Sequence, residues 1–478
     1  MQSIGSDSTR WRVITCAAAA CVALGLGYFI VRGPLQISDS LDNLIELQRN
    51  SLAGLFLNQL HQVGYMRPML WVALKAAFDA SGGYYFEMFK AIHVAQILAL
   101  TILFARLLRV DTMAGALAAV FGLTALIGNH TFGPMVIETF PINHFVTVLI
   151  CCLTVANLIF GAPSLWRDLT ITALFVLATL TVETGLLVWV IGVAGWMVGC
   201  RGASRRTALL LSATLLAYFA FRFSVLPAGT PPLVERSSGF GFHVLEPAEM
   251  AVRFSGRPLL FYAYNVLSHA CSVLFAEPRG GVWLLTRGLI EGGLTPAILI
   301  GTVGSTCTTL LIAGYSIARR RDWMRWQFDD GDRLVLLFVA VLAANAVIGY
   351  PYTRNHIIAP AGVFHALAAT VAAARALSAL DARRLARPVA AGFLAVLVCA
   401  ATASTVRFGA VHYRLREAAW RNQNDWAHQG PTTQRWNVSG DVNAQRLIRQ
   451  LYEESTAMRV PGTYFLPRWM DRYFEEFF

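Results

Sequence analysis

Apolar residues fall in long unbroken blocks along this chain, and polar residues are mostly confined to the stretches between them. A helix needs about 20 apolar residues to cross the roughly 30 Å hydrocarbon core of a bilayer. The blocks that suit a crossing are 13–31, 84–107, 112–129, 143–161, 167–182, 184–200, 207–226, 296–317, 333–350, 356–379 and 388–406. We therefore predict an all-α, polytopic membrane protein with about eleven transmembrane helices. The alternating segments typical of a spanning β-barrel are absent from the sequence.

Basic residues between the blocks predict how the chain is threaded, because cytoplasmic loops are enriched in Lys and Arg. If the N-terminus is cytoplasmic and successive blocks cross the membrane in alternate directions, the main groups of basic loop residues lie on the cytoplasmic side. They are Arg10, Arg12, Arg106, Arg109, Arg167, Arg201, Arg205, Arg206, Arg319, Arg320, Arg321, Arg325, Arg383, Arg384 and Arg387. This requires that a further apolar stretch, 258–276, does not cross fully. Its internal polar residues favour a re-entrant or interfacial helix. The first block is longer than the apolar region of a signal peptide, so we expect an uncleaved helix.

The same threading divides the chain into two parts. Residues 1–406 form the expected transmembrane domain, and residues 407–478 form a small extracytoplasmic C-terminal tail with a helix expected near 443–456. The external loops are 32–83, 130–142, 227–295 and 351–355. In the first of them we expect amphipathic helices at the membrane surface. The Ala- and Arg-rich composition favours a bacterial inner (plasma) membrane.

Composition agrees with a membrane protein. The chain is 56% hydrophobic and only 14% charged, whereas soluble domains carry about 25% charged residues. The net charge of +11 does not indicate nucleic-acid binding, because the basic residues follow the loop pattern. The eight cysteines lie in or beside apolar segments and show neither zinc-site spacing nor a disulfide framework.

Two carboxylates, Asp39 and Asp42, stand three residues apart just after the first block. Asp39 could cap a following helix with Asp42 at its third position. A carboxylate at such a helix start is also placed to accept a proton from a substrate hydroxyl. The two interpretations are compatible, and both stay open.

Basic residues mark two further external segments. Arg67 follows Tyr65 and precedes Pro68, which can occupy the first position of a helix. An arginine there can bind a phosphate through two hydrogen bonds, or it can extend to lipid headgroups. Arg354 and His356 stand before another block, where a helix N-terminus favours anions.

The second external loop brings together Glu138, His130 and His144. Glu183 lies between two apolar blocks, where an ionisable group is costly and marks a functional interior, although a structural, hydrogen-bonded role fits equally well. The acidic run 329–332 resembles a metal-binding motif, but it falls in an Arg-rich cytoplasmic loop. A turn that caps the next helix explains it better.

The order of these segments resembles the GT-C superfamily of polyprenyl-phosphate-dependent glycosyltransferases, and especially its bacterial hypothetical members and the transmembrane O-mannosyltransferases that carry TPR tails. The likeness covers roughly residues 10–200, with a weaker echo at 352–355. The matching segments are Asp39 with Asp42, Tyr65-Met66-Arg67-Pro68-Met69, Phe89-Lys90-Ala91-Ile92-His93, Glu138 and Val182-Glu183-Thr184-Gly185. The chain departs from the family by Ser40 in place of a second adjacent Asp, the inserted Met66, Val182 in place of Lys, and the lack of a TPR array.

The resemblance implies an inverting glycosyltransferase that moves a sugar from a polyprenyl-phosphate donor to an acceptor hydroxyl at the extracytoplasmic face. The acceptor would be a glycan, a lipid or a protein. Asp39 would be the general base, with Asp42 assisting and Glu138 orienting the acceptor or helping to hold a metal. Arg67 and Arg354 would offset the charge on the leaving phosphate. The remaining residues expected to bind substrate or phosphate are Tyr65, His130, His144 and His356.

A divalent metal (Mg²⁺ or Mn²⁺) held by Asp39, Asp42 and Glu138 is compatible with the resemblance but is not required by it. A transporter or flippase for a lipid-linked substrate is an alternative, although transporters bind near the membrane midplane and the polar residues here gather at one face. An O-antigen polymerase or ligase is a second alternative, which would depend less on a first-loop carboxylate.

Overall fold

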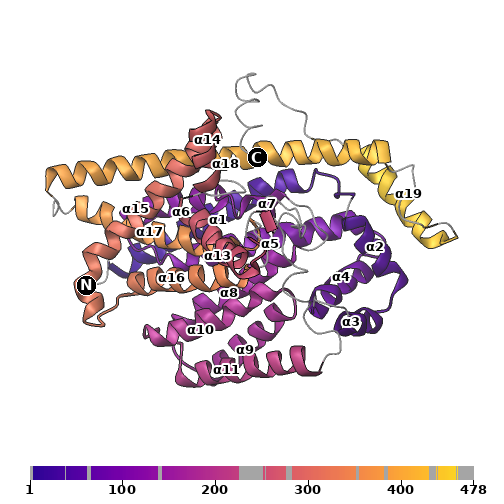
Figure 1. The fold of residues 1–478 in the computed structure, drawn as a ribbon, viewed down its shortest axis with the longest axis horizontal. Helices are drawn as coiled ribbons and strands as arrows, with labels where there is room; N and C mark the ends of the chain where they lie inside the picture. The colour runs from indigo at the N-terminus through magenta and orange to yellow at the C-terminus, as the bar shows by residue number, and fades with distance from the viewer. Residues whose placement is uncertain are drawn as a thin grey trace.

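The computed structural model describes residues 4–37, 39–61, 66–137, 143–225, 251–252, 255–275, 282–350, 355–381, 386–429, 438, 440–458 and 460. Within these residues all regular secondary structure is helical, which confirms the predicted all-α class. Most of the long helices lie side by side in one bundle (Figure 1). The N-terminus lies at one end of the bundle, and the short helices α2 (Asp39–Arg49), α3 (Leu52–His61) and α4 (Pro68–Ala80) lie at the other.

Among the described residues, seven helices are long and apolar enough to cross a membrane, so the chain is an integral membrane protein. They are α1 (Ile4–Ile30), α5 (Tyr85–Leu107), α11 (Arg205–Ala220) with the π-helical turn η2 (Phe221–Val225), α15 (Pro296–Met324), α16 (Asp330–Ile348), α17 (Ala359–Asp381) and α18 (Arg387–Gln429).

Shorter helices fill the rest of the bundle. They are α6 (Met113–Ile127), α7 (Gly133–Ile137), α8 (His144–Ile159), α9 (Leu165–Thr179), the 3₁₀ turn η1 (Glu183–Leu186) with α10 (Leu187–Met197), α13 (Pro258–Phe275) and α14 (Val282–Glu291). Each of the eleven predicted blocks overlaps a helix. Because several of these helices are shorter than the ~20 residues of a full crossing, the count of eleven crossings stays a prediction.

Small residues allow the bundle to pack closely. Helix α17 lies at its centre, where residues 359–370 are all buried and many of them are alanine. Gly122 of α6 faces Thr370 of α17 so closely that a Cβ atom at Gly122 would lie 2.1 Å from the Thr370 hydroxyl oxygen. In a bilayer, where apolar lipid removes the hydrophobic drive between helices, such close contact is a main source of helix association.

A second apolar cluster lies at the α2–α4 end. It joins buried side chains of α2, α4 and the start of α5 to those of α18 and α19 (Val442–Ala457), including Leu44, Phe89, Trp426 and Leu447. The Trp426 indole donates a hydrogen bond to the Leu35 carbonyl at 2.8 Å. Helix α19 confirms the helix expected near 443–456.

Helix α18 is 43 residues long and runs through position 406 without interruption. No break in secondary structure therefore marks the predicted start of the C-terminal tail. The far part of α18 is fastened to the chain that follows α1, since Asn422 donates to the Pro34 carbonyl at 3.0 Å. At the surface, Arg49 of α2 pairs with Asp441, the N-cap of α19, at 2.8 Å.

The acidic run 329–332 is a helix cap, as predicted. Asp329 caps α16 and forms a reciprocal capping box with Asp332. Asp332 is fully buried and also accepts hydrogen bonds from Arg319 Nη2 at 2.7 Å and from the Tyr315 hydroxyl at 2.8 Å. Its lone pairs are used in these contacts, which explains the run without a metal.

Helix α13 packs against α15, α16 and α17. Asn265 donates to the Tyr350 carbonyl at 2.9 Å, just beyond the end of α16. Nine residues later, the Leu274 carbonyl accepts from Thr309, near the middle of α15, at 2.6 Å. The helix therefore runs from the end at which α16 finishes to about the middle of α15. The re-entrant or interfacial character of this segment stays a prediction.

Candidate functional site

Three charged side chains from distant parts of the chain meet between α4, η1 and η2. Arg67 donates two hydrogen bonds to Glu183 Oε2, from Nε at 3.2 Å and from Nη2 at 2.7 Å. Arg222 Nη2 lies 3.4 Å from the other carboxylate oxygen, and Arg222 Nη1 donates to the Tyr218 hydroxyl at 2.6 Å. We call Arg67, Glu183, Arg222 and Tyr218 the Arg67–Glu183 cluster.

The cluster is largely withdrawn from solvent. The side chains of Arg67, Glu183 and Arg222 are 20%, 22% and 9% exposed. Charged groups are rarely buried unless they are paired, and here one carboxylate serves two guanidinium groups. A guanidinium presents its N–H groups in a fork that matches phosphate as well as carboxylate, so a phosphate oxygen is chemically suited to this cluster.

Backbone geometry fixes the Arg67 side of the cluster. Arg67 directly precedes α4, and Pro68 occupies the first turn of that helix, as predicted. The Met69 amide donates to the Leu180 carbonyl at 3.0 Å, which ties the start of α4 to the end of α9. Arg67 is therefore held beside the turn that carries Glu183.

A close backbone contact fixes Glu183. Two residues later, Gly185 lies so near α9 that a Cβ atom there would be 2.2 Å from the Ala178 carbonyl carbon. Only glycine fits this approach, because the obstacle is backbone and cannot move aside. Gly185 thus lets the turn that presents Glu183 pack against α9.

Arg222 enters the cluster from a π-helical turn at the end of α11. Such turns are rare and often occur at functional sites. Its guanidinium carbon lies 5.9 Å from the ring centroids of both Tyr218 and Phe223. These rings shield the charge, and the Tyr218 hydroxyl supplies a polar contact next to it.

Two histidines lie close to the cluster. The Phe145 ring contacts the imidazoles of both His144 and His356, at centroid distances of 4.3 Å and 4.4 Å. His144 is also within electrostatic range of Arg67 and His356. The structure thus brings together three residues that the sequence suggested separately, namely Arg67, His144 and His356.

His130 belongs to a different group. It is buried, and its ring nitrogens face the Ser272 hydroxyl at 3.0 Å and Arg407 Nη2 at 3.1 Å. Arg407 also donates to the Ser305 hydroxyl at 3.1 Å. This network joins the loop after α6 to α13, α15 and α18, which gives His130 a structural role among the described contacts.

The remaining predicted site residues are Asp39, Asp42, Tyr65, Glu138 and Arg354. Asp42 is exposed on α2. Tyr65, Glu138 and Arg354 lie outside the described residues, as does the Asp39 side chain, although the Asp39 backbone begins α2. No group of three or more His, Cys, Asp or Glu side chains within the described ranges is arranged to hold a metal ion. A metal site made by Asp39, Asp42 and Glu138 stays a prediction.

Sequence reasoning missed two arginines, Arg222 and Arg407. Arg222 lies inside the apolar block 207–226, and Arg407 directly follows the block that ends at 406. An ionisable residue within or at the edge of such a block is itself a signal, because its burial demands a partner. That signal identifies the residue but not its partner, which depends on tertiary packing.

Comparison of the chain with protein-family models, with curated proteins and with solved structures yields no match.

Proposed function

We propose that the chain crosses the membrane eleven times, with its N-terminus in the cytoplasm and its C-terminus outside. Ion pairs support this threading, because a pair cannot join the two sides of a hydrocarbon core about 30 Å thick. Each ion pair between described residues joins segments that the threading places on one side. Those expected outside are Arg49–Asp441, Arg67–Glu183 and Arg222–Glu183, and those expected inside include Arg12–Asp111, Arg109–Asp330 and Arg319–Asp332.

We further propose that the protein is a membrane glycosyltransferase that takes its sugar from a polyprenyl-phosphate donor, in a bacterial inner membrane. The Arg67–Glu183 cluster carries this proposal. It holds two guanidinium groups in fixed positions at the end of the bundle where α2 begins, so that the donor phosphate would meet preorganised positive charge. Such preorganised electrostatics are usually the largest single contribution to catalysis.

The proposed reaction is a single displacement with inversion. Asp39 accepts the proton of the acceptor hydroxyl, and the acceptor oxygen forms a bond to the anomeric carbon. The bond between that carbon and the phosphate oxygen breaks, and its electron pair leaves with the polyprenyl phosphate. Arg67 and Arg222 offset the negative charge that develops on this leaving group. A phosphate leaves without protonation, so no general acid is required.

Glu183 has a positioning role in this scheme. Its carboxylate accepts hydrogen bonds from both arginines and so sets the spacing of their guanidinium groups before the donor arrives. His144 and His356 lie beside the cluster and would line the passage of the donor sugar.

The location of the polar groups favours an enzyme over a transporter. Transporters place their substrate sites near the midplane of the membrane. The Arg67–Glu183 cluster instead lies where several helices begin or end, at the beginning of α4 and η1 and at the end of α11. An O-antigen polymerase or ligase shares a lipid-linked donor, and the role of Asp39 separates it from the proposed enzyme.

A transfer assay tests the proposal. Purified full-length protein in liposomes would receive radiolabelled polyprenyl-phosphate sugars, with release of label from the lipid as the readout. We expect Asp39→Asn to lower the rate by about 10²–10⁴ and Arg222→Gln to lower it by about 10²–10³. Arg206→Gln, which removes an exposed charge at the start of α11, is the matched control and should leave turnover unchanged.

The outcomes separate the alternatives. Full turnover by Asp39→Asn with loss in Arg222→Gln would move the base elsewhere and favour the polymerase or ligase. Movement of intact lipid-linked sugar across the bilayer without release of label would favour the transporter.

A further inference from the structure

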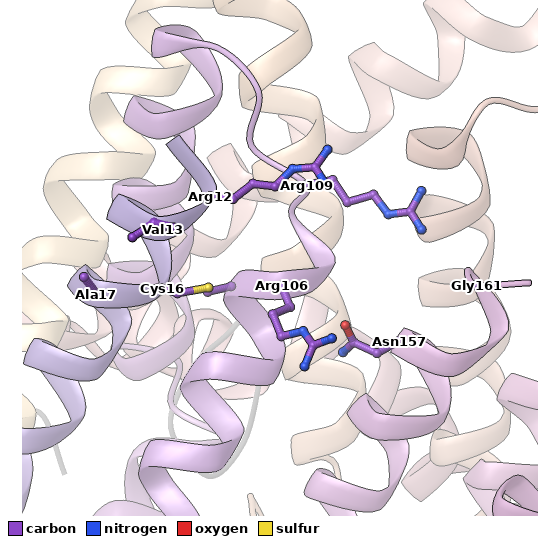
Figure 2. A pocket seen from close by; sticks show the side chains of 9 residues that line it. Arg12, Val13, Cys16, Ala17, Arg106, Arg109, Asn157 and Gly161 are labelled. Carbon is purple, nitrogen blue, oxygen red and sulfur yellow. The ribbon is translucent and has the colours of Figure 1, made fainter. Parts of the chain in front are cut away.

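A second candidate site lies at the opposite end of the bundle from the Arg67–Glu183 cluster. A cavity of about 900 Å³ opens there between α1, α5 and the end of α8. Figure 2 shows Arg12 from α1, Arg106 from the last turn of α5 and Arg109 from the loop just after α5 around this space. Asn157 of α8 lies opposite the Arg106 side chain. Three arginines around one opening indicate a site for an anion.

Arg12 and Arg109 already have acidic partners. Arg12 donates to Asp111 Oδ1 from Nε at 3.0 Å and from Nη2 at 2.7 Å. Arg109 pairs with Asp330 and donates to the Phe160 carbonyl at 3.1 Å. These contacts hold both guanidinium groups at the rim of the cavity.

Arg106 differs from these two. It is exposed, and it makes no hydrogen bond or ion pair with any described residue. The amide group of the neighbouring Asn157 donates to the Leu103 and Leu153 carbonyls at 3.0 Å and 2.8 Å, so that side chain is held in place beside it. The cavity therefore contains one guanidinium group, that of Arg106, without a hydrogen bond or ion pair to a described residue. An incoming phosphate would bind to this group.

The remaining wall of the cavity is apolar. Val13 and Ala17 of α1 line it. Val13 is 62% exposed, and beyond the cavity α1 presents further apolar surface at Leu24, which is 56% exposed. A ligand that fits both features has an anionic head and a hydrocarbon tail.

We propose that this cavity binds an anionic phospholipid, with the headgroup phosphate on Arg106 and the acyl chains along α1. Basic pockets between transmembrane helices are suited to acidic headgroups. Arg12 and Asp111 are 56% and 48% exposed, and exposed pairs are weak. Arg12 can therefore turn from Asp111 to the phosphate as a second contact.

Thermal unfolding of the full-length protein in neutral detergent tests this site. The probes are dioctanoyl phosphatidylglycerol, dioctanoyl phosphatidylcholine and inorganic phosphate. We expect only phosphatidylglycerol to raise the melting temperature in a saturable way, because a ligand that binds the folded state stabilises it. The concentration dependence of the shift gives the affinity.

Two variants should move that affinity in opposite directions. Arg106→Gln is expected to weaken it about fivefold, the effect of one basic residue near an anionic membrane surface. Asp111→Asn should strengthen it by a similar factor of about five, because Arg12 loses its competing carboxylate. Arg206→Gln removes a charge at the same end of the bundle, away from the cavity, and should leave it unchanged.

Three results would overturn the proposal. Equal shifts with phosphatidylglycerol and phosphatidylcholine would show that the headgroup charge is not recognised. An equal shift with inorganic phosphate would identify a site for a soluble anion instead of a lipid. Unchanged affinity in Arg106→Gln, with the melting temperature of the lipid-free protein preserved, would place the lipid elsewhere. None of these variants alters the Arg67–Glu183 cluster, so this test and that of the proposed enzyme are independent.

Discussion

Removing the charge of Glu183 should destabilise the protein, because two arginines lose the carboxylate that they share. The variant Glu183→Gln preserves shape and one acceptor oxygen but leaves Arg67 and Arg222 without this counter-charge. Breaking a buried ion pair by removing one partner costs roughly 3–5 kcal/mol. The side chains here retain 9–22% exposure, so we expect a somewhat smaller loss, about 2–4 kcal/mol.

A double-mutant cycle isolates the interaction itself. Unfolding of Glu183→Gln, Arg67→Gln and the double variant would be followed by tryptophan fluorescence in mixed micelles with increasing SDS. The bond of 2.7 Å from Arg67 Nη2 to the carboxylate should give a coupling free energy of about 1.5–3 kcal/mol, the range for hydrogen bonds to charged groups.

The exposed pair Arg12–Asp111 is the matched control. It has the same donor–acceptor distance of 2.7 Å, but its side chains are 56% and 48% exposed. We expect a coupling free energy below about 1 kcal/mol for it. If the two cycles gave equal values, burial would not strengthen the Arg67–Glu183 pair, and the argument for a preorganised cluster would fail.

Three further predictions concern other features. Gly185→Ala should destabilise by about 1–3 kcal/mol or more through its clash with the α9 backbone, whereas Gly25→Ala in α1, which meets nothing within 4 Å, should be neutral or slightly stabilising; thermal melts of both would show this. Asn345→Ala should cost about 2–4 kcal/mol, because its fully buried amide joins α16 to the start of α17 through bonds of 2.8 Å and 3.1 Å; a melt close to that of the wild type would refute it. Hydrogen bonds from the Ala444 amide and Arg49 lower the pKa of Asp441. The ionised Asp441 therefore stabilises the docking of α19 above the ordinary Asp pKa, and this stabilisation is lost as the pH falls through the lowered pKa. Hydrogen exchange of α19 should rise in that acidic range, and Asp441→Asn should remove this pH dependence.

Much of the fold follows from simple sequence patterns. The apolar blocks locate helices because a bilayer crossing requires a continuous apolar run. Pro68 starts α4 and Asp329 caps α16, since both residue types act through their own local backbone. These features need no knowledge of the rest of the chain.

Features that depend on distant contacts were not predictable. Glu183 could be flagged, but its partners come from 116 residues earlier and 39 residues later, and no local pattern encodes such a pairing. The length of α18 was missed for a related reason. Its polar second part forms no apolar block, and it is held as a helix by contacts such as that of Trp426 with the chain after α1. Helix propensity and hydropathy describe one segment of the chain at a time. The partners of Glu183 and the length of α18 depend instead on contacts between two distant segments.

The uninterrupted length of α18 has a mechanical consequence. At 1.5 Å per residue its 43 residues form a rod about 65 Å long, roughly twice the thickness of the hydrocarbon core. The C-terminal end of α18 contributes to the second apolar cluster, in which α19 packs against α2 (Figure 1). A straight helix transmits rotation as a lever does, so a tilt of about 10° at the bundle end would displace the α19 end by roughly 11 Å. A tilt of α18 would therefore displace α2, the helix that contains Asp39 and Asp42, without any change of structure within α2.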